Sequence, residues 1–163
     1  MCDVSAHTAY LAAWVFTAIG GTKPEHGERL SLPDLLDGAD YFNRMVISKD
    51  ELEHGIRDLV NAGLVSVVGD SFALTDTGRE MWEIIWRKYE ARKSGSDPIA
   101  LAEKRLKLIP CTAGLAGWSV TQQEFDHAFA AYRASFAENV RKFDPKLAAF
   151  MEQSEDSRRG TSG

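Results

Sequence analysis

A helix whose two ends are both marked in the sequence constrains the fold of this chain more than any other feature. Ser48 and Glu51 have the spacing of a capping box, in which the serine hydroxyl accepts a free N–H of the first turn and the glutamate reaches back. Gly63 stands where a helix ends in the left-handed conformation. One buried side is predicted by apolar residues at helical spacing, namely Leu52, Ile56, Leu59 and Val60. We therefore expect an amphipathic helix between Ser48 and Gly63.

A β-hairpin is predicted directly after this helix. Residues 64–68 and 71–74 are two β-prone runs, and Gly69 and Asp70 between them favour a tight turn. A further helix follows and extends to residue 92, and Thr77 and Glu80 offer it a second capping box.

The N-terminal segment carries no charged residue between Val4 and Thr22. Its apolar centre, residues 9–19, is far shorter than the ~20 residues of a membrane-spanning helix, and no Lys or Arg precedes it to begin a signal peptide. Its spacing is that of a helix packed on a core, with Leu11, Trp14, Val15, Ala18 and Ile19 on one stripe. Cys2 and Cys111 stand far apart without metal or redox spacing. We expect a buried first helix, a cytoplasmic location and no membrane partner.

A short strand and a second helix are expected between these segments. Residues 29–31 can hold the strand, and Pro33 suits the first turn of the helix. The apolar face of that helix consists of Leu32, Leu35, Leu36 and Ala39. Residues 40–47 are expected to form a turn-containing connection, anchored inward by Tyr41, Phe42, Met45 and Val46.

The C-terminal half is predicted to be helical. Asp97 and Pro98 begin a helix that ends near residue 108, and Thr121 and Glu124 form a third capping box. The long helix that this box opens, 125–143, carries an apolar side made of Phe125, Ala128, Phe129, Tyr132, Phe136, Val140 and Phe143. A shorter helix covers residues 146–152, and we expect residues 153–163 to be a disordered tail.

This order of elements resembles the winged helix-turn-helix superfamily over residues 8–80. The residues that carry the resemblance are Glu51-Leu52, Leu59-Val60-Asn61-Ala62-Gly63-Leu64-Val65, Gly69-Asp70 and Leu74-Thr75-Asp76-Thr77-Gly78. Residues 39–43, Ala-Asp-Tyr-Phe-Asn, are similar to a segment of small bacterial proteins of unassigned role. The resemblance implies a mainly α (α+β) winged helix-turn-helix fold with a small β-hairpin wing at 1–80 and a C-terminal helical extension at 81–152. It also implies a DNA-binding transcription regulator, since such domains place the helix before the hairpin in the major groove, although others serve in protein–protein contacts alone.

The charges of this segment oppose the DNA hypothesis. The formal net charge is −5, and residues 29–80, with five Lys or Arg against ten Asp or Glu, account for all of it. The outward face of the helix at 48–63 is predicted to carry Asp50, Glu51, His54, Arg57, Asp58 and Asn61. The wing, residues 66–73, has no Lys or Arg and bears Asp70 at its tip, whereas DNA affinity draws on cations that neutralise phosphates.

If duplex DNA is bound, the candidate contact residues are Arg44, Ser48, Lys49, His54, Arg57 and Asn61. A secondary basic patch could hold phosphate or complement an acidic partner, or it could simply coat solvated helix faces. The patch consists of Arg87, Lys88, Arg92, Lys93, Lys104, Arg105 and Lys107.

Self-association is a further expectation. Trp82 and Trp86 lie one turn apart and could form a dimer seam, or they could pack on the 125–143 helix of the same chain. That long helix could itself mediate a homodimer.

No motif for an enzyme, cofactor or metal is found. Glu51 with His54, and Glu124 with His127, have the Glu-x-x-His spacing of di-iron ligands, but both glutamates are predicted to serve capping boxes. Cys111 stands in a loop without a local base. Two hypotheses remain open: a DNA-binding regulator, and a winged-helix module that contacts another protein without DNA.

Overall fold

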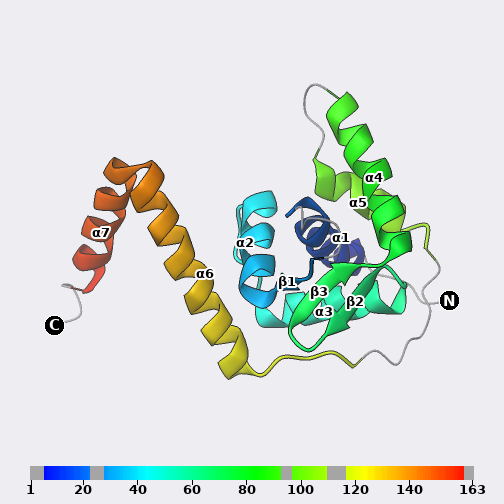
Figure 1. The fold of residues 1–163 in the computed structure, drawn as a ribbon, viewed down its shortest axis with the longest axis horizontal. Coiled ribbons are helices and arrows are strands. Elements are labelled where there is room, and N and C mark those ends of the chain that lie inside the picture. Colours follow the sequence, from blue (N-terminus) through cyan, green and yellow to red (C-terminus); the bar gives the residue numbers. More distant parts are fainter. Residues whose placement is uncertain (1–5, 23–27, 93–96, 110–116, 160–163) are drawn as a thin grey trace.

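The computed structural model describes residues 6–22, 28–92, 97–109 and 117–159, with the backbone alone for residues 6, 7 and 154–159. This part of the chain is mainly helical with one small antiparallel sheet (Figure 1), which confirms the mainly α, α+β class. None of the described helices has the length and apolar character needed to cross a bilayer. The elements are α1 Ala6–Gly21, β1 Leu30–Ser31, α2 Leu32–Asn43, α3 Lys49–Asn61, β2 Val65–Val68, β3 Ser71–Leu74, α4 Asp76–Ala91, α5 Pro98–Leu106, α6 Gln122–Phe143 and α7 Pro145–Arg159.

Helix α1 is the centre of the core. The stripe predicted for it is buried, and so is the opposite side, because α5 packs on α1 together with α2 and α3. A helix covered all round is apolar all round, which explains its lack of charged residues. From α4 and α5, Ile85, Ile99 and Ala102 enter the same buried cluster. The elements from α1 to β3 and the two helices after them, α4 and α5, therefore share one core.

The sheet has the order β1-β3-β2, and both pairings are antiparallel. Leu30 and Val67 lie on either side of the buried Phe72 in this register. Gly69 has φ 57°, as the first residue of a tight hairpin turn requires. The predicted hairpin and the short strand before the second helix are both confirmed.

The connection between α2 and α3 differs from its prediction. α2 continues to Asn43, and Arg44 turns the chain with a left-handed φ of 52°. This turn leaves Tyr41, Met45 and Val46 exposed, contrary to the inward anchoring expected of them. Phe42 is half-buried against the core, as predicted. Ile47, which the prediction did not name as an anchor, is buried directly before the N-cap of α3.

The N-cap of α4 also differs from its prediction. Thr75 caps the helix, since its hydroxyl accepts from the Gly78 N–H at 3.1 Å, so the capping box expected at Thr77 and Glu80 is wrong. The Thr75 hydroxyl also donates to the Gly63 carbonyl at 2.6 Å, which holds the start of α4 against the end of α3. The cap thus depends on a tertiary contact.

Trp82 of α4 packs on α1, and Trp86 packs on Trp82. The Trp82 ring meets Phe16 edge-on at 6.1 Å between centroids, and Trp86 lies beside Trp82 at 5.6 Å. Packing of these rings on the 125–143 helix is therefore wrong, because that helix packs on α2. The dimer seam at Trp82 and Trp86 stays a prediction.

Helix α6 meets the body of the protein only along its first half. Phe125, Ala128 and Tyr132 are buried, and the Tyr132 hydroxyl donates to Asp40 of α2 at 2.6 Å. The second half leaves the body, and α7 folds back along it (Figure 1). The helix expected at 146–152 extends to Arg159, so residues 153–159 of the expected tail are helical.

Candidate nucleic-acid interface

The outward face of α3 is built by the cap at its start. Ser48 accepts from the Glu51 N–H, and the Glu51 carboxylate accepts from Ser48 N at 2.9 Å, so the predicted capping box is confirmed. Helical spacing then turns Leu52, Ile56 and Leu59 into the core. Of the predicted outward residues, Asp50, His54 and Arg57 are exposed, while Glu51, Asp58 and Asn61 are half-buried. Ser48, a candidate DNA contact, has its hydroxyl engaged in the cap.

Glu53 belongs to the candidate site on α3, and the sequence pattern did not predict it. It is a buried carboxylate on the flank of the helix, where its Oε1 accepts from the Val120 N–H at 2.9 Å and pairs with Lys49 Nζ at 2.9 Å. Burial raises the pKa of Glu53, but the hydrogen bonds from Lys49 and Val120 and the charges of Lys49 and Arg57 outweigh it. The pKa of Glu53 therefore lies below its ordinary value, and the group is ionised at neutral pH.

Glu53 engages two of the cations expected to contact DNA. The Lys49 side chain is only 23% exposed, and the Arg57 guanidinium lies 3.8 Å from Glu53 Oε2 while its Nε donates to the Glu53 carbonyl at 3.2 Å. Asp50, by contrast, keeps 95% of its side chain exposed. The outward face is thus dominated by carboxylate charge.

His54 and Asp58 form a second pair on this face. His54 Nε2 lies 4.0 Å from Asp58 Oδ2. Burial raises the pKa of Asp58, and the charges of His54 and Arg57 oppose that rise. The imidazole is therefore directed at a carboxylate of its own helix.

Two arginines outside α3 border the same region. Arg44, an expected DNA contact, is exposed at the turn before α3. Arg29 lies beside the wing, where Nη2 donates to the Ser66 and Ser71 carbonyls at 2.8 and 3.0 Å. The wing lacks a base in its own sequence, so only the tertiary structure reveals that Arg29 reaches it.

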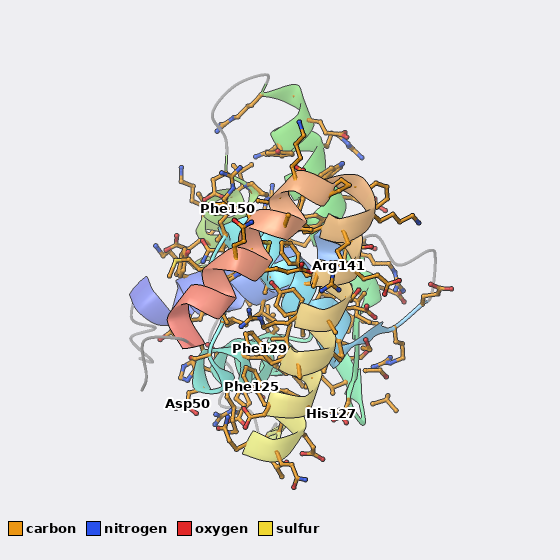
Figure 2. All side chains as sticks on the ribbon, turned by 90° about the vertical axis from the view of Figure 1, so that its left-hand side faces the viewer. Asp50, Phe125, His127, Phe129, Arg141 and Phe150 are labelled. Carbon is orange, nitrogen blue, oxygen red and sulfur yellow. The ribbon has the colours of Figure 1, made fainter. Side chains whose placement is uncertain are left out.

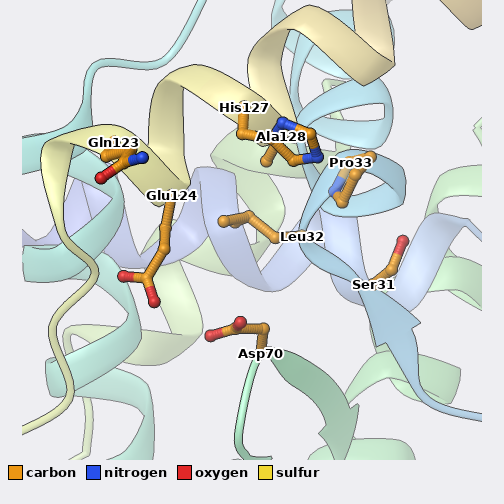
Figure 3. Close-up of a pocket in the computed structure, with 8 residues that line it drawn as sticks. All are labelled: Ser31, Leu32, Pro33, Asp70, Gln123, Glu124, His127 and Ala128. Carbon is orange, nitrogen blue, oxygen red and sulfur yellow. The ribbon is translucent and has the colours of Figure 1, made fainter.

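The segment before α6 runs along α3 and the wing. Besides the Val120 bond to Glu53, the Trp118 ring meets Phe72 of β3 edge-on at 5.2 Å between centroids. The start of α6 then faces the wing tip (Figure 3). One flank of the predicted DNA-binding helix is thereby covered by the chain itself.

A cavity of about 410 Å³ lies between the wing tip, the start of α2 and the first turn of α6. Figure 3 shows Asp70 and Glu124 pointing into the same space from opposite sides, with Leu32 between them. The Glu124 carboxylate caps α6 by accepting from Thr121 N and Oγ1 at 2.8 and 2.6 Å, and these hydrogen bonds lower its pKa. Both carboxylates add negative potential beside the wing.

The secondary basic patch is divided between α4 and α5. Lys107 pairs with Glu103 at 2.6 Å, Arg105 is half-buried, and Lys93 lies outside the described residues. Exposed bases of the patch are Arg87, Lys88, Arg92, Lys104 and Lys107. Figure 1 shows α4 rising away from the sheet and from α3, so the patch does not extend the α3 surface.

No grouping of three or more His, Cys, Asp and Glu side chains suited to a metal occurs within the part of the chain that the structure describes. Glu51 and Glu124 are both engaged in capping boxes, as predicted. Cys111 lies outside the described residues.

Fold and site together define a mainly helical α+β protein with a carboxylate-rich helix beside a small hairpin. The sequence matches no family model, and searches of curated proteins and of solved structures find no significant similarity.

Proposed function

We propose that this chain is a winged helix-turn-helix protein with a C-terminal helical extension. The order α1-β1-α2-α3-β2-β3 supports this, as does the position of α3 between a tight turn and the hairpin. In such a domain α3 is the helix that contacts the partner molecule, and β2–β3 is the wing.

We further propose that the outward face of α3 binds a basic segment of another protein rather than duplex DNA. One observation carries this proposal: Lys49 and Arg57 are both paired with Glu53, while Asp50, 3.9 Å from Lys49, keeps its carboxylate exposed. Asp58 on the same helix and Asp70 at the wing add to the negative surface. Such a surface repels phosphate and attracts Lys and Arg.

The test compares two fluorescent probes by anisotropy: a peptide rich in Lys and Arg, and a random-sequence duplex. We expect the protein to bind the peptide with an affinity that falls as the salt concentration rises. We expect no binding of the duplex at ~50 mM salt. The double variant Asp50→Asn with Asp58→Asn should bind the peptide about tenfold more weakly, equivalent to roughly 1.4 kcal/mol. The matched control is Glu80→Gln with Glu83→Gln, two exposed acids of α4, which should change nothing.

A DNA-binding transcription regulator is the second candidate. It is favoured by Arg44 and Arg29, whose guanidinium groups border α3 and the wing. It predicts duplex binding that falls steeply between ~50 and ~200 mM salt and weakens in Arg57→Ala and Lys49→Ala. An equal loss in Arg87→Ala would assign the binding to the α4–α5 patch instead. Salt-sensitive duplex binding that weakens in Arg57→Ala and Lys49→Ala, but not in Arg87→Ala, would replace the protein-partner proposal.

A further inference from the structure

The second half of α6 and all of α7, residues 133–159, form a projecting arm. Figure 2 looks onto it: Arg141 and Phe150 lie towards its outer end, and Phe125 and Phe129 lie lower, where α6 meets the body. The apolar side that is buried at Phe125 and Tyr132 continues outward at helical spacing. The exposed apolar residues of the arm are Phe136, Phe143, Leu147 and Phe150, with Phe143 77% and Phe150 66% exposed.

A second exposed apolar surface lies at the end of α2. Tyr41, Met45 and Val46 form this α2 patch, and Tyr41 is 76% exposed. The Tyr41 ring stands edge-on to Phe42 at 5.1 Å, which orders it without covering it. One chain thus presents two apolar surfaces whose side chains remain largely exposed, and exposed patches of this kind mark interaction sites.

The charges around the two surfaces are complementary. α2 carries Asp34, Asp37 and Asp40 and neither Lys nor Arg. Near the turn between α6 and α7, Arg141 pairs with Glu152 at 2.9 Å, and Lys142 and Lys146 stand against Asp144. Burial, and then the charges of Asp40 and Asp34, raise the pKa of Asp37. A cation supplied from outside α2 would relieve the repulsion between Asp37 and these two carboxylates.

The area involved suits a stable dimer. Each copy offers four exposed apolar residues on the arm and three on the α2 patch. A large aromatic side chain buries about 150–250 Å² in full, and these seven are 40–77% exposed, so each can lose roughly 100 Å². Covering both surfaces in two copies therefore removes about 1,400 Å² from water, within the range of specific interfaces.

We propose that two copies of this chain exchange arms, so that the arm of each copy covers the α2 patch of the other around a twofold axis. A twofold arrangement covers both surfaces of both copies at once and closes the assembly. It sets Lys142 and Lys146 of one copy near the α2 carboxylates of the other. This interface is separate from the outward face of α3 and does not depend on what that face binds.

Sedimentation velocity of the full chain, from about 1 to 100 µM, is the test. The wild type is expected at twice the 18.0 kDa of one chain. Phe143→Ser with Phe150→Ser, and separately Tyr41→Ser with Met45→Ser, should give monomers with unchanged circular dichroism. The matched control is Leu108→Ser, because Leu108 is 82% exposed beyond the end of α5 and should not affect the dimer.

Charge reversal provides a second, independent test. Lys142→Glu and Asp37→Lys should each weaken the dimer at least tenfold, and the double variant should recover most of the loss. These substitutions also carry the test if the serine variants fail to fold. A monomeric wild type at about 100 µM, a dimer that survives the Tyr41 and Met45 substitutions, or an equal loss in Leu108→Ser overturns the proposal.

Discussion

Glu53 of α3 and the backbone N–H of Val120 are joined by a hydrogen bond of 2.9 Å across 67 positions of the sequence. The bond ties the segment that leads into α6 to the flank of the helix expected to contact DNA. It also places an ionised carboxylate where it engages Lys49 and Arg57. A single acidic residue therefore supports the fold and changes the charge of the candidate interface.

Replacing Glu53 should destabilise the protein. Glu53→Ala removes the acceptor of the Val120 N–H and the closer of the two carboxylates paired with Lys49, so we expect the free energy of unfolding to fall by about 1–3 kcal/mol. Urea denaturation followed by circular dichroism measures it, with the exposed Glu80→Ala as control. A loss no larger than that of the control would contradict the role of Glu53.

The contribution of Glu53 should depend on pH. Its pKa is held below the ordinary value of 4.5, so its stabilisation is present above the unfolded pKa and is lost as pH falls through the folded pKa. The stability difference between wild type and Glu53→Gln should therefore be largest near neutral pH and shrink below pH 4.5. Denaturation curves at a series of pH values check this, and a constant difference would argue against an ionised Glu53.

The docking of α6 should weaken without the Tyr132 hydroxyl. Tyr132→Phe deletes the hydrogen bond to Asp40 and is expected to cost about 1 kcal/mol. Faster hydrogen exchange of the α6 amides is the sensitive readout. Tyr41→Phe is the matched control and should be neutral, because it deletes the hydroxyl of a ring that is exposed on the single chain and keeps the apolar ring itself. Equal effects of the two variants would show that the Tyr132 bond does not hold α6.

Gly55 is expected to be intolerant of a methyl group. A Cβ there would lie 2.7 Å from Val15 Cγ2 and 3.0 Å from the Leu11 carbonyl, because α1 and α3 approach closely at this point. Gly55→Ala should therefore cost about 1–3 kcal/mol, although alanine favours a helix by about 1 kcal/mol over glycine. Thermal denaturation shows whether the stability of Gly55→Ala falls or rises, and a stabilised variant would refute the close contact. Ser135→Ala on the exposed side of α6 is the control and should be slightly stabilising.

Arg44 should tolerate glycine. Its φ of 52° is left-handed, which costs an arginine about 1 kcal/mol that glycine does not lose. Arg44→Gly is thus expected to leave stability unchanged or to raise it, whereas Arg57→Gly within α3 should lower it by about 1 kcal/mol. The same denaturation assay compares both, and a strongly destabilised Arg44→Gly would mean that its side chain holds the turn.

Local patterns predicted the elements well, because the groups that decide them are close in sequence. Ser48 with Glu51, Thr121 with Glu124, and Asp97 with Pro98 each mark a helix start that the structure confirms. The candidate site was predicted less completely. The outward direction of Asp50, His54 and Arg57 followed from periodicity, but the engagement of Lys49 and Arg57 by Glu53 did not. Glu53 is buried by the segment around Val120, and no helical pattern signals a cover that distant.

The sequence by itself determined the helices, the hairpin and the acidic balance of residues 29–80, since capping, turn chemistry and charge are properties of neighbouring residues. Only the tertiary structure decided which surfaces are covered. Tyr41, Met45 and Val46 have the composition of a core but are exposed on the single chain, while α1 is enclosed by α5 as well as by α2 and α3. Burial is a property of the assembled elements, and an apolar residue is enclosed only where another element arrives to cover it.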